Sequence, residues 1–178
     1  MTEISSSVSA APTARIEADP DVPIIRITRD FAATPAQLFR AHTDPELFAR
    51  WIGPRDLTTR IDVWDARDGG SFRFVSGRTT DAGDEEYAFR GSFHEVSPQR
   101  IVQTFAWEEM PEGVAPETLR FEDLGDGRTQ LRTQSLVDSF EGRDQWLASG
   151  MEGGVNDGYA KLDALLADGA VPGGSDAA

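Results

Sequence analysis

Two sets of residues in this sequence, one aromatic and one polar, could do chemistry together. Period-two spacing places large aromatic rings on one face of successive strands, which is typical of an apolar small-molecule pocket. These rings are Phe72, Phe74, Phe89, Phe93, Phe105, Trp107 and Phe121. Gln103, Thr133, Ser135 and Tyr159 fall on the same face and could orient a ligand by hydrogen bonds. An ordinary core contains the same rings, and buried polar groups can also be satisfied by one another or by water.

Four glycines interrupt the stretch LASGMEGGVNDGYAKLDALL (147–166), which otherwise repeats like a helix. Each glycine costs a helix roughly 1 kcal/mol relative to alanine. We expect the missing side chains to leave volume between this helix and a sheet, so that Gly154→Trp would shrink a cavity and abolish binding of large ligands. Close packing of the helix, or a break near Gly153 and Gly154, would explain the same pattern.

Acid–base chemistry in such a pocket would need a carboxylate, a histidine or a tyrosine with a shifted pKa. Asp65 and Glu95 lie at strand ends, where Arg67 and Arg73 could pair with them or meet a ligand carboxylate. Structural salt bridges are the commoner role of such residues. No set of residues in the sequence requires a catalytic function. The catalytic residues are therefore unknown, and we favour a non-enzymatic protein.

The histidines, His42 and His94, are far apart in the sequence and have no partner at helical spacing. We expect His94 to be exposed on its strand and His42 to interact favourably with the end of a short helix. No dinucleotide, phosphate-loop or nucleophile motif occurs, and cysteine is absent. The sequence therefore predicts neither a metal site nor a cofactor.

Length and composition indicate one globular domain with tails. The chain has 178 residues, of which 39% are hydrophobic, and a net charge of -14. Such a charge argues against binding to nucleic acid phosphates. No stretch reaches the roughly 18 apolar residues of a membrane span, and no signal peptide is apparent. We expect a cytoplasmic protein without membrane insertion. The sequence does not decide whether the protein forms a homodimer.

Two sequence periods indicate the elements that position these residues. Residues 24–31 alternate apolar and charged side chains and predict a strand. Two short helices follow, led by Pro35 and Pro45, the second with Trp51 on its apolar face. The period-two pattern then predicts six antiparallel strands, at 57–63, 71–74, 87–93, 101–107, 119–124 and 126–136. A helix expected over 140–166 is the one remaining element long enough to cover the sheet.

The expected domain spans residues 22–168. The composition of residues 1–21 indicates a disordered arm, in which residues 13–18 could pair weakly with a sheet edge. The composition of residues 169–178 indicates a flexible tail. The fold class is α+β, of the helix-grip type. It consists of a curved antiparallel sheet of about seven strands, two short helices and a long C-terminal helix.

Four segments, in order, carry a resemblance to a known family: DPELFARWIGP, DARDGGSFRF, YAFRGSF and GMEGGVNDGYAKLDALL. Over about residues 24–167 the chain resembles the activator-of-Hsp-ninety ATPase homologue family (C-terminal-domain type) of the SRPBCC, or START-like, superfamily. Relatives usually carry Gly-Trp where this chain has Gly154-Val155, which implies a larger or differently shaped hollow if that face points inward. The resemblance implies a hydrophobic small-molecule site and supplies no catalytic residue.

Three functions are consistent with these observations. The first is binding of a hydrophobic or aromatic small molecule between the sheet and the C-terminal helix. The second is a polyketide cyclase-like or hydrolase-like enzyme that uses the same pocket, and the third is a co-chaperone-type interaction module. Converging polar groups in the pocket would favour the enzyme, and a small dry pocket beside an exposed apolar patch would favour the module. The residues expected to line the pocket are Trp51, Phe72, Phe74, Phe89, Phe93, Gln103, Phe105, Trp107, Phe121, Thr133, Met151, Gly154, Val155 and Tyr159.

Overall fold

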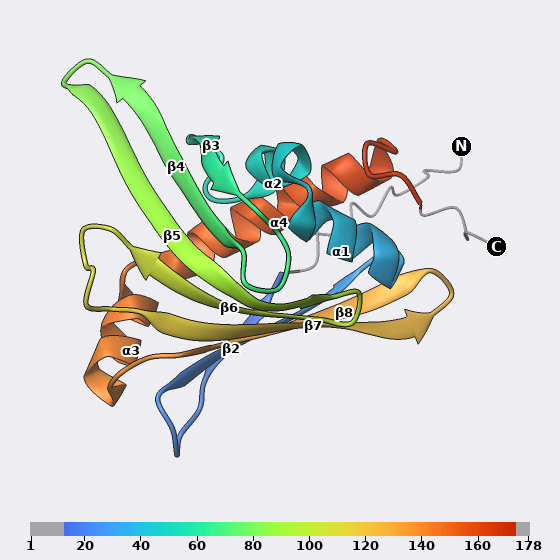
Figure 1. Cartoon of the computed structure of the whole chain (residues 1–178), viewed down its shortest axis with the longest axis horizontal. Helices are drawn as coiled ribbons and strands as arrows, with labels where there is room; N and C mark the ends of the chain where they lie inside the picture. Colours follow the sequence, from blue (N-terminus) through green and yellow to red (C-terminus); the bar gives the residue numbers. More distant parts are fainter. Residues whose placement is uncertain (1–12, 174–178) are drawn as a thin grey trace, which may run out of the picture.

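A computed structural model describes residues 13–173 of the chain (Figure 1). An eight-stranded antiparallel sheet, in the order β1-β2-β8-β7-β6-β5-β4-β3, curves around helices on one of its faces. The strands are β1 (Arg15–Ala18), β2 (Ile24–Phe31), β3 (Thr58–Trp64), β4 (Ser71–Thr80), β5 (Gly83–Ser97), β6 (Arg100–Trp107), β7 (Ala115–Gly125) and β8 (Arg128–Leu136). The helices are α1 (Pro35–Thr43), α2 (Pro45–Trp51), α3 (Phe140–Ala148) and α4 (Met151–Ala167). The predicted helix-grip fold is confirmed.

The two short helices begin where the sequence predicts, because each has a capping residue. The Gln37 backbone N–H donates to the Thr34 hydroxyl at 3.3 Å, and the Thr34 N–H donates to the Gln37 side chain at 3.0 Å. Asp44 ends α1 and caps α2 by accepting hydrogen bonds from two backbone N–H groups. These caps satisfy N–H groups that a helix start leaves unpaired. The two helices therefore follow each other directly and present His42 and Trp51 to the interior.

Both ends of the ordered fold extend beyond residues 22–168. Residues 15–18, expected within the N-terminal arm, form β1, in which Arg15 lies opposite Thr28 of β2. The backbone N–H of Ala14 donates to Asn156 in α4 at 2.8 Å. In the segment expected as a tail, Val171 is only 1% exposed. Residues 1–12 of the expected arm and 174–178 of the expected tail lie outside the described residues.

Two expected elements differ from the structure. The single helix predicted over 140–166 is wrong, because Gly150 has a φ of +87°, which separates α3 from α4. Glycine adopts this left-handed conformation without a steric cost. In β3, a bulge between Ile61 and Val63 reverses the inward alternation, so Val63 is exposed and Trp64 lies opposite Phe72.

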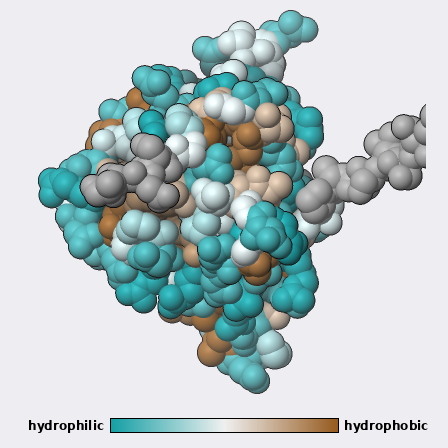
Figure 2. Space-filling model, turned by 90° about the vertical axis from the view of Figure 1, so that its right-hand side faces the viewer, coloured by the Kyte–Doolittle hydropathy of each residue, from teal (hydrophilic) through white to brown (hydrophobic). Residues whose placement is uncertain are grey.

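The core lies between the concave face of the sheet and α1, α2 and α4. The inward side chains of β2, β4, β6, β7 and β8 pack against these helices in one cluster. Figure 2 shows one side of the molecule as mainly hydrophilic, with hydrophobic residues in small separate patches. Among residues 13–173, no helix is long and apolar enough to cross a membrane.

Candidate functional site

A cavity of about 40 Å³ lies between the sheet and the two short helices α1 and α2. It is lined by His42, Phe48, Trp64, Phe72, Phe74, Ile101, Gln103, Phe105 and Leu119. A space of this size holds one or a few water molecules, whereas ligand sites usually occupy about 300–1,000 Å³. The hollow is therefore real but small, and it lies under α1 and α2 rather than under the C-terminal helix as expected.

The structure brings most of the expected pocket residues into one region. Four of them line the cavity: Phe72, Phe74, Gln103 and Phe105. Others belong to the surrounding core without touching the cavity: Trp51, Phe89, Phe93, Phe121, Met151, Val155 and Tyr159. The Trp107 indole N–H is buried and has no hydrogen-bond partner within residues 13–173. Thr133 lies near the Tyr159 hydroxyl and acts to lower the pKa of that group.

The helical glycines do not line the cavity, and the expectation that they keep it open is wrong. A Cβ on Gly158 would lie 3.0 Å from the carbonyl oxygen of Trp51, so this glycine allows α4 to pack closely on the end of α2. A Cβ on Gly154 would meet Pro54 at 3.5 Å, and one on Gly153 would meet nothing within 4 Å. Gly154→Trp would therefore press on Pro54 and would not fill the cavity.

The carboxyl group of Glu117, a half-buried residue of β7, is hydrogen-bonded to a residue of the cavity wall. The Ser135 hydroxyl donates to Glu117 Oε1 at 2.7 Å, and Gln103 Nε2 donates to Oε2 at 3.0 Å. Burial raises the pKa of Glu117 above its usual value, although both hydrogen bonds oppose that shift. Because Gln103 lines the cavity, it links this carboxyl group to the hollow.

Sequence reasoning missed Glu117 because the expected strand began at Leu119. The inward alternation of Phe121 and Leu119 extends back through Glu117 to Ala115, all of them in β7. Pro116 obscured this extension, since proline is uncommon inside strands. Continuing the period of two towards the start of the strand was the signal that could have found this residue.

His42 is buried at 5% exposure and contacts the rings of Trp51 and Phe121. Burial lowers the pKa of His42 to about 4, so the ring is neutral at pH 7. Its Nδ1 lies 2.7 Å from the Leu38 carbonyl oxygen. A carbonyl can only accept, so we assign the hydrogen to Nδ1, which leaves Nε2 as an acceptor. His42 therefore interacts with the C-terminal part of α1, as expected from the sequence, and does so as a neutral ring that hydrogen-bonds the Leu38 carbonyl.

The cavity wall therefore offers hydrogen-bond acceptors to a guest. Among residues 13–173, neither His42 Nε2 nor Gln103 Oε1 has a hydrogen-bond partner. The other lining groups are apolar. This arrangement is suited to an aromatic molecule that carries an N–H or O–H donor.

Tyr159 and Arg29 hold α4 against the sheet on the other side of the core. Tyr159 packs edge-to-face on Phe31 with ring centroids 5.3 Å apart, and burial raises its pKa to about 12. The Arg29 side chain is 1% exposed, and its Nη1 donates to Asp163 of α4 at 3.0 Å. Both residues act as anchors of the long helix, and neither lines the cavity.

The charged residues considered for catalysis lie in surface ion pairs. Asp65 pairs with Arg67 at 2.9 Å, and Glu95 accepts from Arg100 Nε at 3.0 Å. This pairing lowers the pKa of Glu95. His94 is exposed, as expected. Within residues 13–173, no group of three or more His, Cys, Asp or Glu side chains could hold a metal ion.

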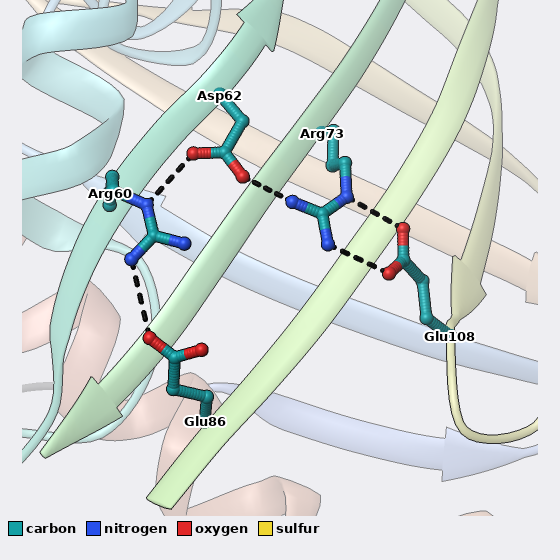
Figure 3. A network of polar contacts seen from close by, with 5 residues as sticks. All are labelled: Arg60, Asp62, Arg73, Glu86 and Glu108. Atoms are coloured by element: carbon teal, nitrogen blue, oxygen red, sulfur yellow. Dashed lines mark hydrogen bonds and ion pairs between the residues drawn. The ribbon is translucent and has the colours of Figure 1, made fainter. Parts of the chain in front are cut away.

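Arg73, the remaining candidate, belongs to an ion-pair network on the outer face of β3, β4 and β5 (Figure 3). It donates to both oxygens of Glu108 at 2.8 and 2.9 Å and also pairs with Asp62. Arg60 pairs with Asp62 at 2.8 Å and with Glu86 at 3.3 Å. Each arginine therefore lies between two carboxylates, which lowers the pKa values of Asp62 and Glu108. We name these five residues the outer network.

Helix α3 is the least buried element beside the cavity. None of its residues is buried, although Trp146 stacks on Phe105 with ring centroids 6.4 Å apart and an interplanar angle of 14°. Phe105 also lines the cavity, so Trp146 covers one wall of it from outside. Gly150 connects α3 to α4 through its left-handed backbone.

Comparisons with known proteins agree with this architecture. Residues 32–167 match a family model described as Activator of Hsp90 ATPase homolog 1-like protein. A crystal structure of a protein from Rhodobacter sphaeroides is similar, with 27% identity, a TM-score of 0.74, and coverage of 86% of this chain and 99% of that chain. Protein Ms6760 from Mycobacterium smegmatis has 26% identity, a TM-score of 0.75, and coverage of 88% and 99%. An HSP90 activator from Plasmodium falciparum has 20% identity, a TM-score of 0.57, and coverage of 81% and 96%, which shows a shared fold alone. No curated protein compared with the chain matches it.

Proposed function

Since the chain belongs to the family of Activator of Hsp90 ATPase homolog 1-like proteins, we propose that it binds a small aromatic molecule inside the helix grip. The guest occupies the space between Phe105 and α3 and extends into the cavity under α1 and α2. This proposal retains the hydrophobic ligand expected from the sequence but changes its position from the glycines of α4 to the wall covered by α3.

One observation carries the proposal: Phe105, a residue of the cavity wall, is stacked with Trp146 of α3, a helix without buried residues. Trp146 occupies the face of Phe105 that an aromatic guest would use. Stacked aromatic pairs contribute about 0.5–1.5 kcal/mol beyond their buried area, so one ring can replace another at modest cost. A guest of ordinary ligand size would need more room than the 40 Å³ of the cavity, so the proposal requires α3 to move, with Gly150 as the connection to α4 about which it would turn.

The acceptors in the cavity wall define the polar part of the guest. Gln103 Oε1 and His42 Nε2 each accept a hydrogen bond, so the guest carries a hydroxyl or N–H group on its ring. Glu117 fixes the orientation of Gln103 by accepting its Nε2 hydrogen. A phenol or an aromatic amine satisfies both requirements, whereas a carboxylate would meet acceptors only.

A fluorescence titration with N-phenyl-1-naphthylamine tests this function, because the probe is neutral, aromatic and carries one N–H donor. We expect saturable binding that is weaker, by about three- to tenfold, for 1-phenylnaphthalene, which lacks the donor. Gln103→Met should remove this difference between the two probes. Trp146→Ala should tighten binding of both probes, because it vacates the face of Phe105.

Trp107→Phe is the matched control, since Trp107 is a partly buried aromatic residue outside the cavity. Binding that is unaffected by Trp146→Ala and Gln103→Met but changed by Trp107→Phe would contradict the proposal. The same conclusion would follow if neither probe bound saturably.

Neither alternative function receives comparable support. A cyclase-like enzyme would need an acid in contact with its substrate, and the buried carboxyl of Glu117 is separated from the cavity by Gln103. A co-chaperone role belongs to the Plasmodium falciparum protein, whose 20% identity supports the fold alone. We therefore propose ligand binding rather than catalysis.

A further inference from the structure

The convex face of the sheet carries a row of arginines that the sequence alone does not reveal. Reading across five adjacent strands, the residues that lie opposite one another are Arg15, Thr28, Arg132, Arg120 and Arg100. Like charges directly opposite in a sheet are destabilising. The arrangement is unexpected in a chain of net charge -14, whose 17 basic residues could all be paired with acids.

Arg120 is the centre of this row and has the least compensation. Its strand neighbours on the two sides are Arg132 and Arg100. Within residues 13–173, its guanidinium makes no hydrogen bond or ion pair. Arg100 pairs with Glu95 and is not among the residues that line the groove described below. Arg132 donates to the Gln130 side chain at 2.8 Å and pairs with one carboxylate, that of Glu122, at 3.4 Å.

A groove of about 290 Å³ lies along the row, over β1, β2, β8 and β7. Its charged lining consists of four arginines and a single carboxylate: Arg15, Arg26, Arg120, Arg132 and Glu17. The remaining lining residues include Thr28, Thr118 and Gln134, whose side chains can donate hydrogen bonds. The ion pairs that Arg15 and Arg132 make with carboxylates are exposed, so water screens them and another anion can replace them, whereas the pair of Arg26 with Asp19 is partly buried.

We propose that this groove binds the phosphate group of a small soluble molecule, with the guanidinium groups of Arg120 and Arg132 as its main contacts. A phosphate monoester carries about -1.5 to -2 charges at pH 7, so one group can compensate two facing arginines. Arginine presents a planar fork of donors that matches phosphate oxygens. A carboxylate supplies only one charge, and among residues 13–173 the nearby carboxylate of Glu95 interacts with Arg120 at a distance, without an ion pair. This site lies on the opposite face of the sheet from the proposed aromatic site and does not depend on it.

Titration with inorganic pyrophosphate, followed by NMR of the backbone amides and arginine Nε–H groups, tests the proposal. We expect saturable shifts in β2, β7 and β8, with a Kd of about 1 mM or below at low salt and weaker binding as salt is added. The double variant R120A/R132A should weaken binding at least tenfold while retaining the wild-type thermal unfolding transition. The matched control R60A/R73A removes two arginines from the outer network on the same face and should bind pyrophosphate like the wild type.

Three results would overturn the proposal. The first is equal loss of binding in R120A/R132A and R60A/R73A, which would indicate a response to net charge only. The second is self-association in analytical ultracentrifugation that R120A/R132A abolishes, with no pyrophosphate shifts in the groove, because a second copy would then be the occupant. The third is preferential binding to vesicles of phosphatidylcholine and phosphatidic acid over pyrophosphate, because the source of phosphate would then be a lipid surface.

Discussion

The inner and outer faces of β2, β8 and β7 differ in how their charged side chains are partnered, although residues of the two faces alternate along the same strands. On the inner face, Ser135 and Gln103 donate to the two carboxyl oxygens of Glu117. On the outer face, Arg120 and Arg132 lie opposite each other and are exposed. The Glu117 carboxylate has specific hydrogen-bond partners, whereas Arg120 on the outer face has no ion pair among residues 13–173.

This difference follows from the cost of removing polar groups from water. An unpaired buried group costs about 1–3 kcal/mol, so inner-face substitutions should affect folding. Exposed charges are screened, so outer-face substitutions should affect binding more than folding. Stability measurements on matched inner-face and outer-face variants can therefore test whether the two faces differ in this way.

The largest expected effect concerns His42. Its pKa is lowered to about 4 from 6.5, so between these pH values the unfolded chain binds a proton that the folded chain does not. Stability should therefore fall as pH drops from 6.5 to 4, by on the order of 3 kcal/mol from this residue. Urea unfolding across this range should show that His42→Phe flattens the dependence, while His94→Phe, on the exposed surface, leaves it unchanged. Parallel behaviour of the wild type and His42→Phe would contradict a buried neutral ring.

The second effect concerns the buried carboxyl group. Glu117→Leu should lower the free energy of unfolding by about 2 kcal/mol, because it leaves the donors of Ser135 and Gln103 without an acceptor. The triple variant E117L/S135A/Q103L removes those donors as well and should recover most of the loss, as chemical denaturation can measure. Glu122→Leu, on the outer face of the same strand, should change stability little. If the triple variant were less stable than Glu117→Leu, unsatisfied donors would not be the cause.

The third effect extends the comparison to the two sides of α4. Gly158→Ala places a Cβ 3.0 Å from the Trp51 carbonyl and 3.4 Å from the Gly53 nitrogen, whereas Gly153→Ala places one in open space. Gly153→Ala should stabilise the protein by up to about 1 kcal/mol through helix propensity. Gly158→Ala should be less stable than Gly153→Ala by about 1–2 kcal/mol, because overpacking cancels that gain. Equal melting temperatures for the two variants would show that the contact on α2 is unimportant.

The smallest effect is expected in the outer network. Arg73→Ala removes the contacts with Glu108 and Asp62, yet all three side chains remain accessible to water. We expect the urea midpoint to stay within experimental error of the wild type at physiological salt, since exposed ion pairs contribute little. A large loss of stability that persists at high salt would assign a structural role to the network and weaken the contrast between the faces.

The sequence predicted most of the fold because its signals are local. The caps at Thr34 and Asp44 and the alternation in the strands depend only on neighbouring residues. The unpredicted features depend on contacts between distant segments. The bulge at Ile61 is set by pairing with β4, and the role of Gly158 is set by the approach of Trp51.

The candidate site was predicted in part for the same reason. The parity of the strands placed Gln103 and Phe105 inward, where both line the cavity. The sequence did not predict that α1 contributes His42 to the cavity wall. Periodicity shows which face of a helix is apolar, but it does not show which residues of the sheet that face contacts. The arginine row could not be predicted at all, since Arg120 and Arg132 become neighbours only through strand register.

One NMR experiment tests most directly whether one sheet carries two separate sites. N-phenyl-1-naphthylamine and pyrophosphate are added in turn to the same labelled sample. We predict that the aromatic probe shifts the side-chain signals of Gln103 and Trp146, that pyrophosphate shifts those of Arg120 and Arg132, and that the two sets of shifts are additive. Shifts from both probes in the same residues, or loss of one set when the other probe binds, would contradict the account.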